Sequence, residues 1–85
     1  MSTAESDILT RVVSPDDSSL DQRAAEAILA MGFKAGDRQR MAELAEKARR
    51  GELSEEEQSE TDSYERIGHF VALLKSKARR SLKAG

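Results

Sequence analysis

Few side chains in this sequence could do chemistry, and the lone histidine, His69, is the first of them. A zinc site needs several nitrogen or sulfur ligands, but the chain has one histidine and no cysteine. At 100° per residue, His69 falls opposite the apolar stripe of its predicted helix, so we expect its imidazole to face solvent. The histidine therefore predicts neither a catalytic base nor a metal ligand.

Carboxylates form the second group, gathered between residues 55 and 65. A calcium loop places oxygen ligands at alternating positions around a glycine turn, and that pattern is missing here. Serine and threonine are frequent, yet none lies in a nucleophile elbow or a phosphate-binding loop. We expect no catalytic, cofactor-binding or metal-binding residue, and we interpret the chain as a non-enzyme.

Basic residues close the sequence and form a candidate nucleic-acid contact. On a helical wheel they spread around much of the circumference, no aromatic residue for base stacking lies among them, and a neighbouring acidic block would repel phosphate. Nucleic-acid binding is therefore kept as a third hypothesis. Its residues are Lys75, Lys77, Arg79, Arg80 and Lys83.

These charges belong to one long predicted helix over residues 53–83. Ser54 stands three residues before Glu57, the spacing of a capping box. Acidic residues fill the first half of the helix and basic residues the second, which suits the helix dipole. An apolar stripe about 120° wide predicts packing against two neighbours. Its members are Tyr64, Ile67, Phe70, Val71, Leu74, Ala78 and Leu82.

Two shorter helices precede it. The first is predicted from a cap at Ser19 to a stop at Gly32, and the second covers residues 37–50, with Gly51 as its stop. Because only residues 51–54 separate the second helix from the long one, the two should form an antiparallel hairpin.

The predicted hairpin brings particular side chains together. Leu44 should lie near Thr61 and Tyr64, and Met41 near Tyr64, Ile67 and Gly68. The fold class is therefore all-α: a helical hairpin with a long C-terminal helix, a shorter helix packed across it, and a flexible N-terminal arm. The domains are an arm over residues 1–18 and a three-helix domain over residues 19–85.

The arm carries a short helical stripe that ends at Pro15. It could be a loose tail, a helical turn or two docked on the body, or a segment that orders on binding. Leu73 lies off the apolar stripe of the long helix, and Phe70 lies on it, where core packing is the competing interpretation. The candidate partner-binding residues are Ile8, Leu9, Val12, Val13, Phe70 and Leu73.

Size and charge limit the remaining possibilities. With 85 residues the chain forms one domain, and a body of this size buries only about 60% of the surface that its unfolded chain exposes. Net charge alternates along the sequence between acidic and basic blocks, which could pair helices internally or face different partners. The sequence lacks an apolar run that could span a bilayer and a basic start followed by an apolar segment, so we expect a cytoplasmic protein without membrane contact.

The segment from Arg40 to Lys83 resembles a recurring group of small uncharacterised bacterial proteins. The shared features are an R-M-x-x-L-x-x-K-x-x-x-G-x-L helix and turn, an S/T-x-E-E start, a tyrosine and an L-x-x-K-A-R ending. Here they are Arg40, Met41, Leu44, Lys47, Gly51, Leu53, Ser54, Glu56, Glu57, Tyr64, Leu74, Lys77, Ala78 and Arg79. Thr61 departs from the pattern, which usually has an apolar residue there.

Members of this group look like the small partner in two-gene modules of the toxin–antitoxin kind. The resemblance implies a regulatory or neutralising role toward a larger, toxin-like enzyme. We therefore expect non-catalytic protein binding, with a homodimeric structural or adaptor protein as the alternative. No ribbon-helix-helix or helix-turn-helix pattern stands out.

Overall fold

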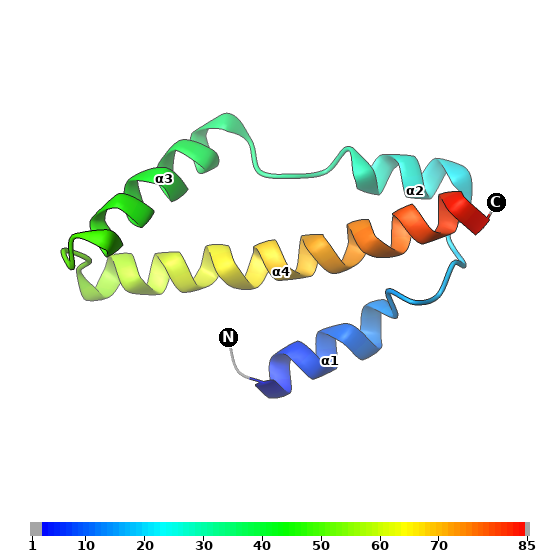
Figure 1. Ribbon diagram of the computed structural model, residues 1–85, viewed down its shortest axis with the longest axis horizontal. Coiled ribbons are helices and arrows are strands. Elements are labelled where there is room, and N and C mark those ends of the chain that lie inside the picture. Colours follow the sequence, from blue (N-terminus) through cyan, green and yellow to red (C-terminus); the bar gives the residue numbers. More distant parts are fainter. Residues whose placement is uncertain (1–2, 85) are drawn as a thin grey trace.

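The computed structural model describes residues 3–84, and this part of the chain contains four α-helices and no strand. They are α1 (Thr3–Val13), α2 (Gln22–Leu29), α3 (Ala35–Arg49) and α4 (Glu55–Ala84). The long α4 is the spine: α2 lies along its C-terminal half, α3 diverges from its N-terminal half, and α1 runs beneath its C-terminal half (Figure 1). The predicted all-α hairpin with a long C-terminal helix is confirmed.

The long helix forms where the sequence predicts it. Ser54 and Glu57 exchange two hydrogen bonds: each side-chain oxygen accepts the other residue's backbone N–H at 3.1 Å. This capping box satisfies two N–H groups that a helix start leaves unpaired. At 1.5 Å per residue, the 30 residues of α4 give a rod of about 45 Å, close to the 47 Å long axis of the molecule.

Gly51 closes the turn between α3 and α4, as predicted. Its φ of +70° lies in the left-handed region, where a Cβ atom is unfavourable. The Gly51 N–H donates to Ala48 O at 3.1 Å and the Glu52 N–H to Lys47 O at 2.9 Å, which is a Schellman motif. The chain therefore reverses within five residues and brings α3 back over α4.

The bounds of α2 differ from the prediction. Asp21, not Ser19, caps it, with Oδ1 accepting the Ala24 N–H at 2.8 Å. The Leu20 N–H donates to Ser81 Oγ on α4, so the preceding segment is pinned before the helix begins. The helix ends at Leu29, ahead of Gly32. We attribute the early end to Phe33, whose ring packs edge-on against Tyr64 with centroids 5.7 Å apart and draws the chain toward α4.

The sequence predicts that a shorter helix packs across the long one, and α2 packs in this way on the C-terminal half of α4. Ala25 of α2 and Ala78 of α4 are both fully buried, which lets the two helices approach closely. The buried apolar side chains are otherwise few, and Leu44 is the only large one that is fully buried among the described residues. A core this small leaves much of the stability to caps, turns and ion pairs.

Of the three states considered for the N-terminal arm, the structure shows the docked helix. Val13 of α1 is 5% exposed, and its carbonyl oxygen accepts a hydrogen bond from Lys77 Nζ at 2.9 Å. A second hydrogen bond joins Ser6 Oγ and His69 Nε2 at 3.1 Å. The expectation that His69 faces solvent is therefore wrong: its ring is half-buried against α1. The flexibility of the arm stays a prediction.

Candidate protein-binding site

The hairpin of α3 and α4 is held along one edge by ion pairs. Arg40 contacts Glu60 through two hydrogen bonds, Nε to Oε2 at 2.9 Å and Nη2 to Oε1 at 2.8 Å. Glu57 Oε2 accepts a hydrogen bond from Lys47 Nζ at 2.6 Å and a longer one from Arg40 Nη2 at 3.4 Å. A two-pronged Arg–carboxylate contact fixes both distance and angle, so it sets the spacing of the two helices.

These contacts shift the pKa values of the groups involved. The Lys47 ammonium, helped by the Ser54 N–H, lowers the pKa of Glu57 to about 2. The Arg40 guanidinium lowers the pKa of Glu60, and Glu60 in turn raises the pKa of Arg40. Both carboxylates therefore stay ionised at neutral pH, and the edge stays closed.

Tyr64 joins the far end of the same hairpin. Its hydroxyl donates to Asp37 Oδ1 at 2.8 Å, and this hydrogen bond, with partial burial, raises the pKa of Tyr64. Its ring meets Phe33 edge-on, and Phe33 also lies beside Gly68. Tyr64 therefore has a structural role: it holds both α3 and the segment that precedes α3 against α4.

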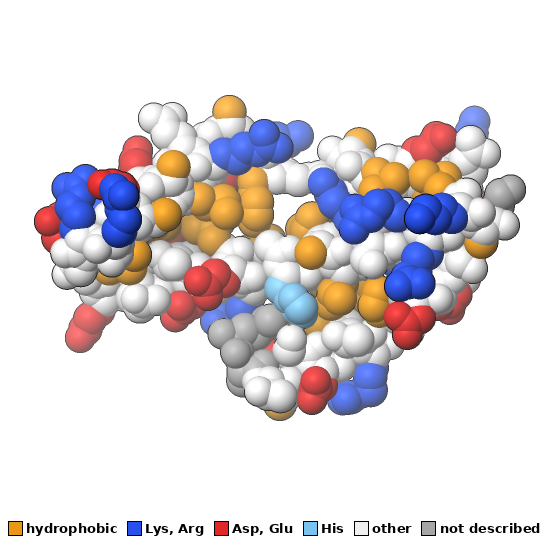
Figure 2. Space-filling view, in the orientation of Figure 1, with side chains coloured by type: hydrophobic (Ala, Val, Ile, Leu, Met, Phe, Trp, Pro, Cys, Tyr) orange, Lys and Arg blue, Asp and Glu red, His pale blue; other side chains and the backbone are white. Residues whose placement is uncertain are grey.

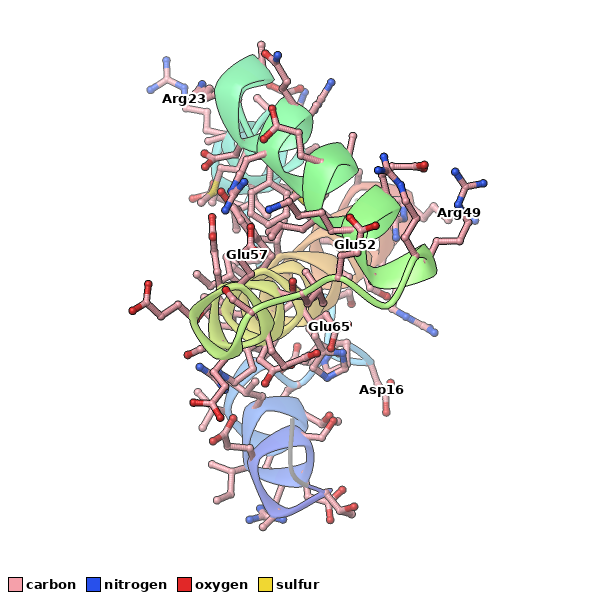
Figure 3. The ribbon with its side chains drawn as sticks, turned by 90° about the vertical axis from the view of Figure 1, so that its left-hand side faces the viewer. Asp16, Arg23, Arg49, Glu52, Glu57 and Glu65 are labelled. Atoms are coloured by element: carbon pink, nitrogen blue, oxygen red, sulfur yellow. The ribbon has the colours of Figure 1, made fainter. Side chains whose placement is uncertain are left out.

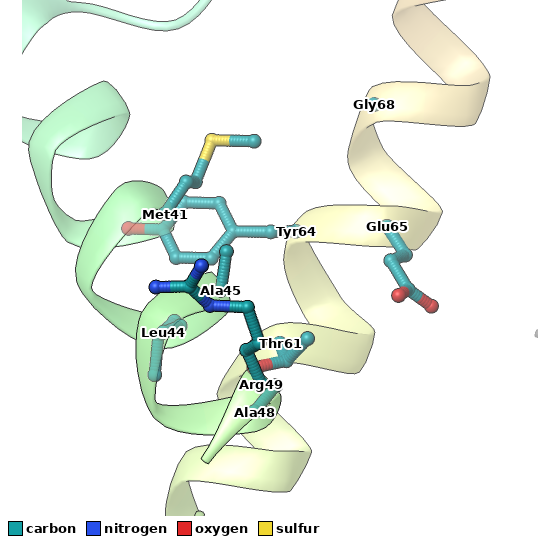
Figure 4. Close-up of a pocket in the computed structure, with 9 residues that line it drawn as sticks. All are labelled: Met41, Leu44, Ala45, Ala48, Arg49, Thr61, Tyr64, Glu65 and Gly68. Atoms are coloured by element: carbon teal, nitrogen blue, oxygen red, sulfur yellow. The ribbon is translucent and has the colours of Figure 1, made fainter.

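The opposite edge of the hairpin opens into an apolar cleft of about 680 Å³. Four of the nine lining residues are small, namely Ala45, Ala48, Thr61 and Gly68. The Tyr64 ring crosses from α4 toward Met41, while Glu65 points away from α3 (Figure 4). The lining residues are Met41, Leu44, Ala45, Ala48, Arg49, Thr61, Tyr64, Glu65 and Gly68. Leu44 and Met41 line the same cleft as their predicted neighbours Thr61, Tyr64 and Gly68, whereas Ile67 is not among the lining residues and is 52% exposed. Direct contacts between these pairs stay predictions.

The two edges differ because the helix periodicity separates polar from apolar residues. On α3, Arg40 and Lys47 are seven residues apart and share one face, while Ala45 and Ala48 lie on another. Figure 3 looks along α4 from the turn: Glu57 lies on one side of the hairpin and Arg49 extends on the other. The ion pairs thus brace the back of the hairpin and leave its apolar front open.

Basic side chains continue this open face along α4. Figure 2 shows apolar side chains in the hollow between α3 and α4, with Lys and Arg side chains gathered over the C-terminal half of α4 on the same side of the molecule. Lys75, Arg79 and Lys83 follow one another at four-residue spacing, which places them in one row. Arg79 and Lys83 are exposed and Lys75 is half-buried. We call these three residues the basic row.

The other predicted nucleic-acid contacts lie elsewhere on α4. Lys77 is committed to the carbonyl of Val13, so it anchors α1. Arg80 is exposed one residue beyond Arg79, about 100° around the helix. The predicted basic set is therefore divided over different faces of α4, as the helical wheel indicates.

The structure also divides the predicted partner-binding residues. On α1, Val13 is buried and Leu9 half-buried, whereas Ile8 is 50% and Val12 74% exposed. Leu73 is half-buried and lies on the face of α4 between His69 and Lys77, both of which contact α1. Phe70 is partly exposed, at 38%. The roles of these six residues in binding stay predictions.

The cleft itself was missed by sequence reasoning. Its signal is the set of small residues on facing positions, with Ala45 and Ala48 on α3 opposite Thr61 and Gly68 on α4. Thr61 stands where the related pattern usually has an apolar residue, and its hydroxyl donates to Glu57 O at 2.8 Å within α4. Small residues in a seam predict either close packing or a gap, and the sequence does not decide which.

Chemistry-bearing side chains do not converge in the described part of the chain. Residues 3–84 contain no group of three or more histidines or carboxylates placed to hold a metal ion. No helix within this range is long and apolar enough to cross a membrane. A comparison with family models, curated proteins and solved structures finds no match to this chain. The antitoxin-type resemblance of residues 40–83 therefore stays a prediction.

Proposed function

We propose that this protein is a non-catalytic binding module that docks a helix of a partner protein in the cleft between α3 and α4. The observation that carries the proposal is the cleft itself: apolar, open along one edge, and braced along the other by Arg40, Lys47 and their carboxylate partners. An apolar cavity exposed to water is unfavourable, and a partner's side chains would remove that cost.

The dimensions suit the apolar face of an amphipathic helix. A cleft of about 680 Å³ is large enough for several aliphatic or aromatic side chains. Small wall residues such as Ala45, Ala48 and Gly68 allow a second backbone to approach closely, as in other helix-in-groove complexes. The basic row beside the cleft favours a partner segment that carries acidic residues.

The resemblance of residues 40–83 extends this proposal. It implies that the partner is a larger enzyme, toxin-like in kind, which the protein inhibits or regulates in the cytoplasm. Inhibition would follow if the docked helix belongs to the enzyme's active-site region or must move during catalysis. The ion pairs and the capped turn give the module a preformed surface, which lowers the entropic cost of binding.

A matched pair of variants tests the docking site. Ala45→Trp places an indole inside the cleft, whereas Ala42→Trp adds the same side chain to an exposed position of α3 outside it. We expect wild type and Ala42→Trp to retain the same identified protein from native lysate, and Ala45→Trp to lose it. The purified partner should then bind wild type in a titration with the same dependence on residue 45.

Three results would contradict the proposal. Equal retention by both tryptophan variants would place binding outside the cleft. A homodimer in sedimentation experiments that only Ala45→Trp dissociates would assign the cleft to a second copy, in favour of the structural or adaptor alternative. Capture of nucleic acid alone, independent of residue 45, would favour the basic end of α4 as the functional surface.

A further inference from the structure

The cleft and the basic row lie on one continuous face of α4. At 100° per residue, Gly68, Lys75 and Arg79 fall within about 40° of one another around the helix axis. Lys83 follows about 40° further on. A helix lying in the cleft and running along α4 would pass Phe33, which lies beside Gly68, and would then reach the row.

We infer that the docked helix is polarised, with apolar residues at one end that fill the cleft and acidic residues at the other that lie over Lys75, Arg79 and Lys83. This inference rests on the proposed function. With a rise of 1.5 Å per residue, the row begins roughly 10 Å beyond Gly68 and ends roughly 22 Å beyond it. The acidic residues of the partner are thus about two to four turns away from its apolar anchors.

The state of the cations supports this assignment. Within residues 3–84, Lys75, Arg79 and Lys83 form no ion pair, whereas Arg40, Lys47, Arg49 and Arg50 each contact a carboxylate. Three unneutralised charges in a row beside an apolar cleft create a local positive potential. An acidic segment would neutralise that potential and gain on-rate as well as affinity.

The charges at the cleft set the polarity. The cleft is lined mainly by apolar groups, so an acidic residue of the partner placed there would lose its hydration without gaining a cationic partner. Arg49 lines the cleft but is paired with Glu46. The acidic end therefore belongs over the basic row and the neutral end in the cleft, and the reverse placement is unfavourable at both ends.

Synthetic peptides test the inference without knowledge of the natural partner. The first is a fluorescein-labelled amphipathic helix with glutamates in its N-terminal turns, where they also stabilise the helix dipole, and leucines at helical spacing in its C-terminal half. Its twin carries glutamine in place of each glutamate. We expect the glutamate peptide to bind about tenfold more tightly at low ionic strength, because each of the three exposed charge pairs contributes about twofold. High salt should remove the difference.

Variants of the protein identify the charges responsible. The double variant Arg79→Gln, Lys83→Gln should reduce the tenfold preference to about twofold, because only Lys75 of the basic row remains. Arg80→Gln also removes one positive charge, but from another face of α4. This variant should therefore keep most of the tenfold preference for the glutamate peptide. Ala45→Trp should weaken both peptides alike, because both fill the cleft with the same leucines.

The outcomes separate the inference from the proposed function. Equal affinity of the two peptides, both lost in Ala45→Trp, would overturn the acidic polarity and leave the cleft as a docking site. Binding of neither peptide, or binding that Ala45→Trp leaves unchanged, would overturn both. A duplex DNA that displaces the glutamate peptide and binds Ala45→Trp as tightly as wild type would assign the row to nucleic acid.

Discussion

Leu44 offers the most direct test of how the hairpin is stabilised. Its side chain is 2% exposed and is the largest one fully buried in the described chain. Leu44→Ala removes three carbon atoms from that position. At about 0.8 kcal/mol for each buried carbon group, the transfer cost is roughly 2.4 kcal/mol.

The neighbouring cleft decides how much is added to this figure. In a closed core the cavity left by Leu→Ala raises the cost further, up to about 5 kcal/mol. Leu44 adjoins an open cleft, so water or a shift of α3 can fill the space. We therefore expect a loss of about 2 to 3 kcal/mol, a large fraction of the roughly 4 to 13 kcal/mol typical for a domain of this length.

Urea unfolding followed by circular dichroism measures this loss, with Ile67→Ala as the control. The control also deletes three carbon atoms, but from a side chain that is 52% exposed, so it should cost about half as much, roughly 1.2 kcal/mol. Similar losses for both variants, or a loss below about 1 kcal/mol for Leu44→Ala, would show that the packing of α3 on α4 contributes little to stability.

Three further predictions concern the charges, the turn and the N-terminal helix. Because the pKa of Glu57 is lowered from 4.5 to about 2, its contribution to the free energy of unfolding is complete above pH 4.5 and is lost as the pH falls toward 2. Glu57→Gln should therefore weaken the pH dependence of the urea midpoint between pH 4.5 and 2. Gly51→Ala should lower stability by about 1 kcal/mol in thermal melts because its φ is positive, whereas Gly36→Ala, in an open helical position, should raise it by several tenths. Lys77→Met should speed hydrogen exchange in α1 and not in α3, whereas Arg80→Met should change neither.

The ends of a helix are predictable from the sequence where a single short motif determines them. The Ser54–Glu57 box and Gly51 are confirmed by their hydrogen bonds and by the positive φ, because caps and turns depend on residues next to one another. Where two signals compete, the prediction fails: Ser19 and Asp21 both offer a cap for α2, and Asp21 forms it.

The candidate site was much less predictable. Periodicity places Arg40, Leu44 and Ala45 on different parts of α3, but it does not give the angle between α3 and α4. That angle follows from the two-pronged contact of Arg40 with Glu60 and from the position of Tyr64 against Phe33. A small difference in this angle would close the cleft or widen it.

The sequence by itself determined the all-α class, the long C-terminal helix with its order of charges, and the antiparallel hairpin, because these depend on composition, period and loop length. Only the tertiary structure decided that α1 docks on α4 through His69 and Lys77, and that the hairpin is closed by ion pairs on one edge and open on the other. Such contacts join residues as far as 64 positions apart in the chain. They depend on the packing of whole helices, which no local pattern of residues encodes.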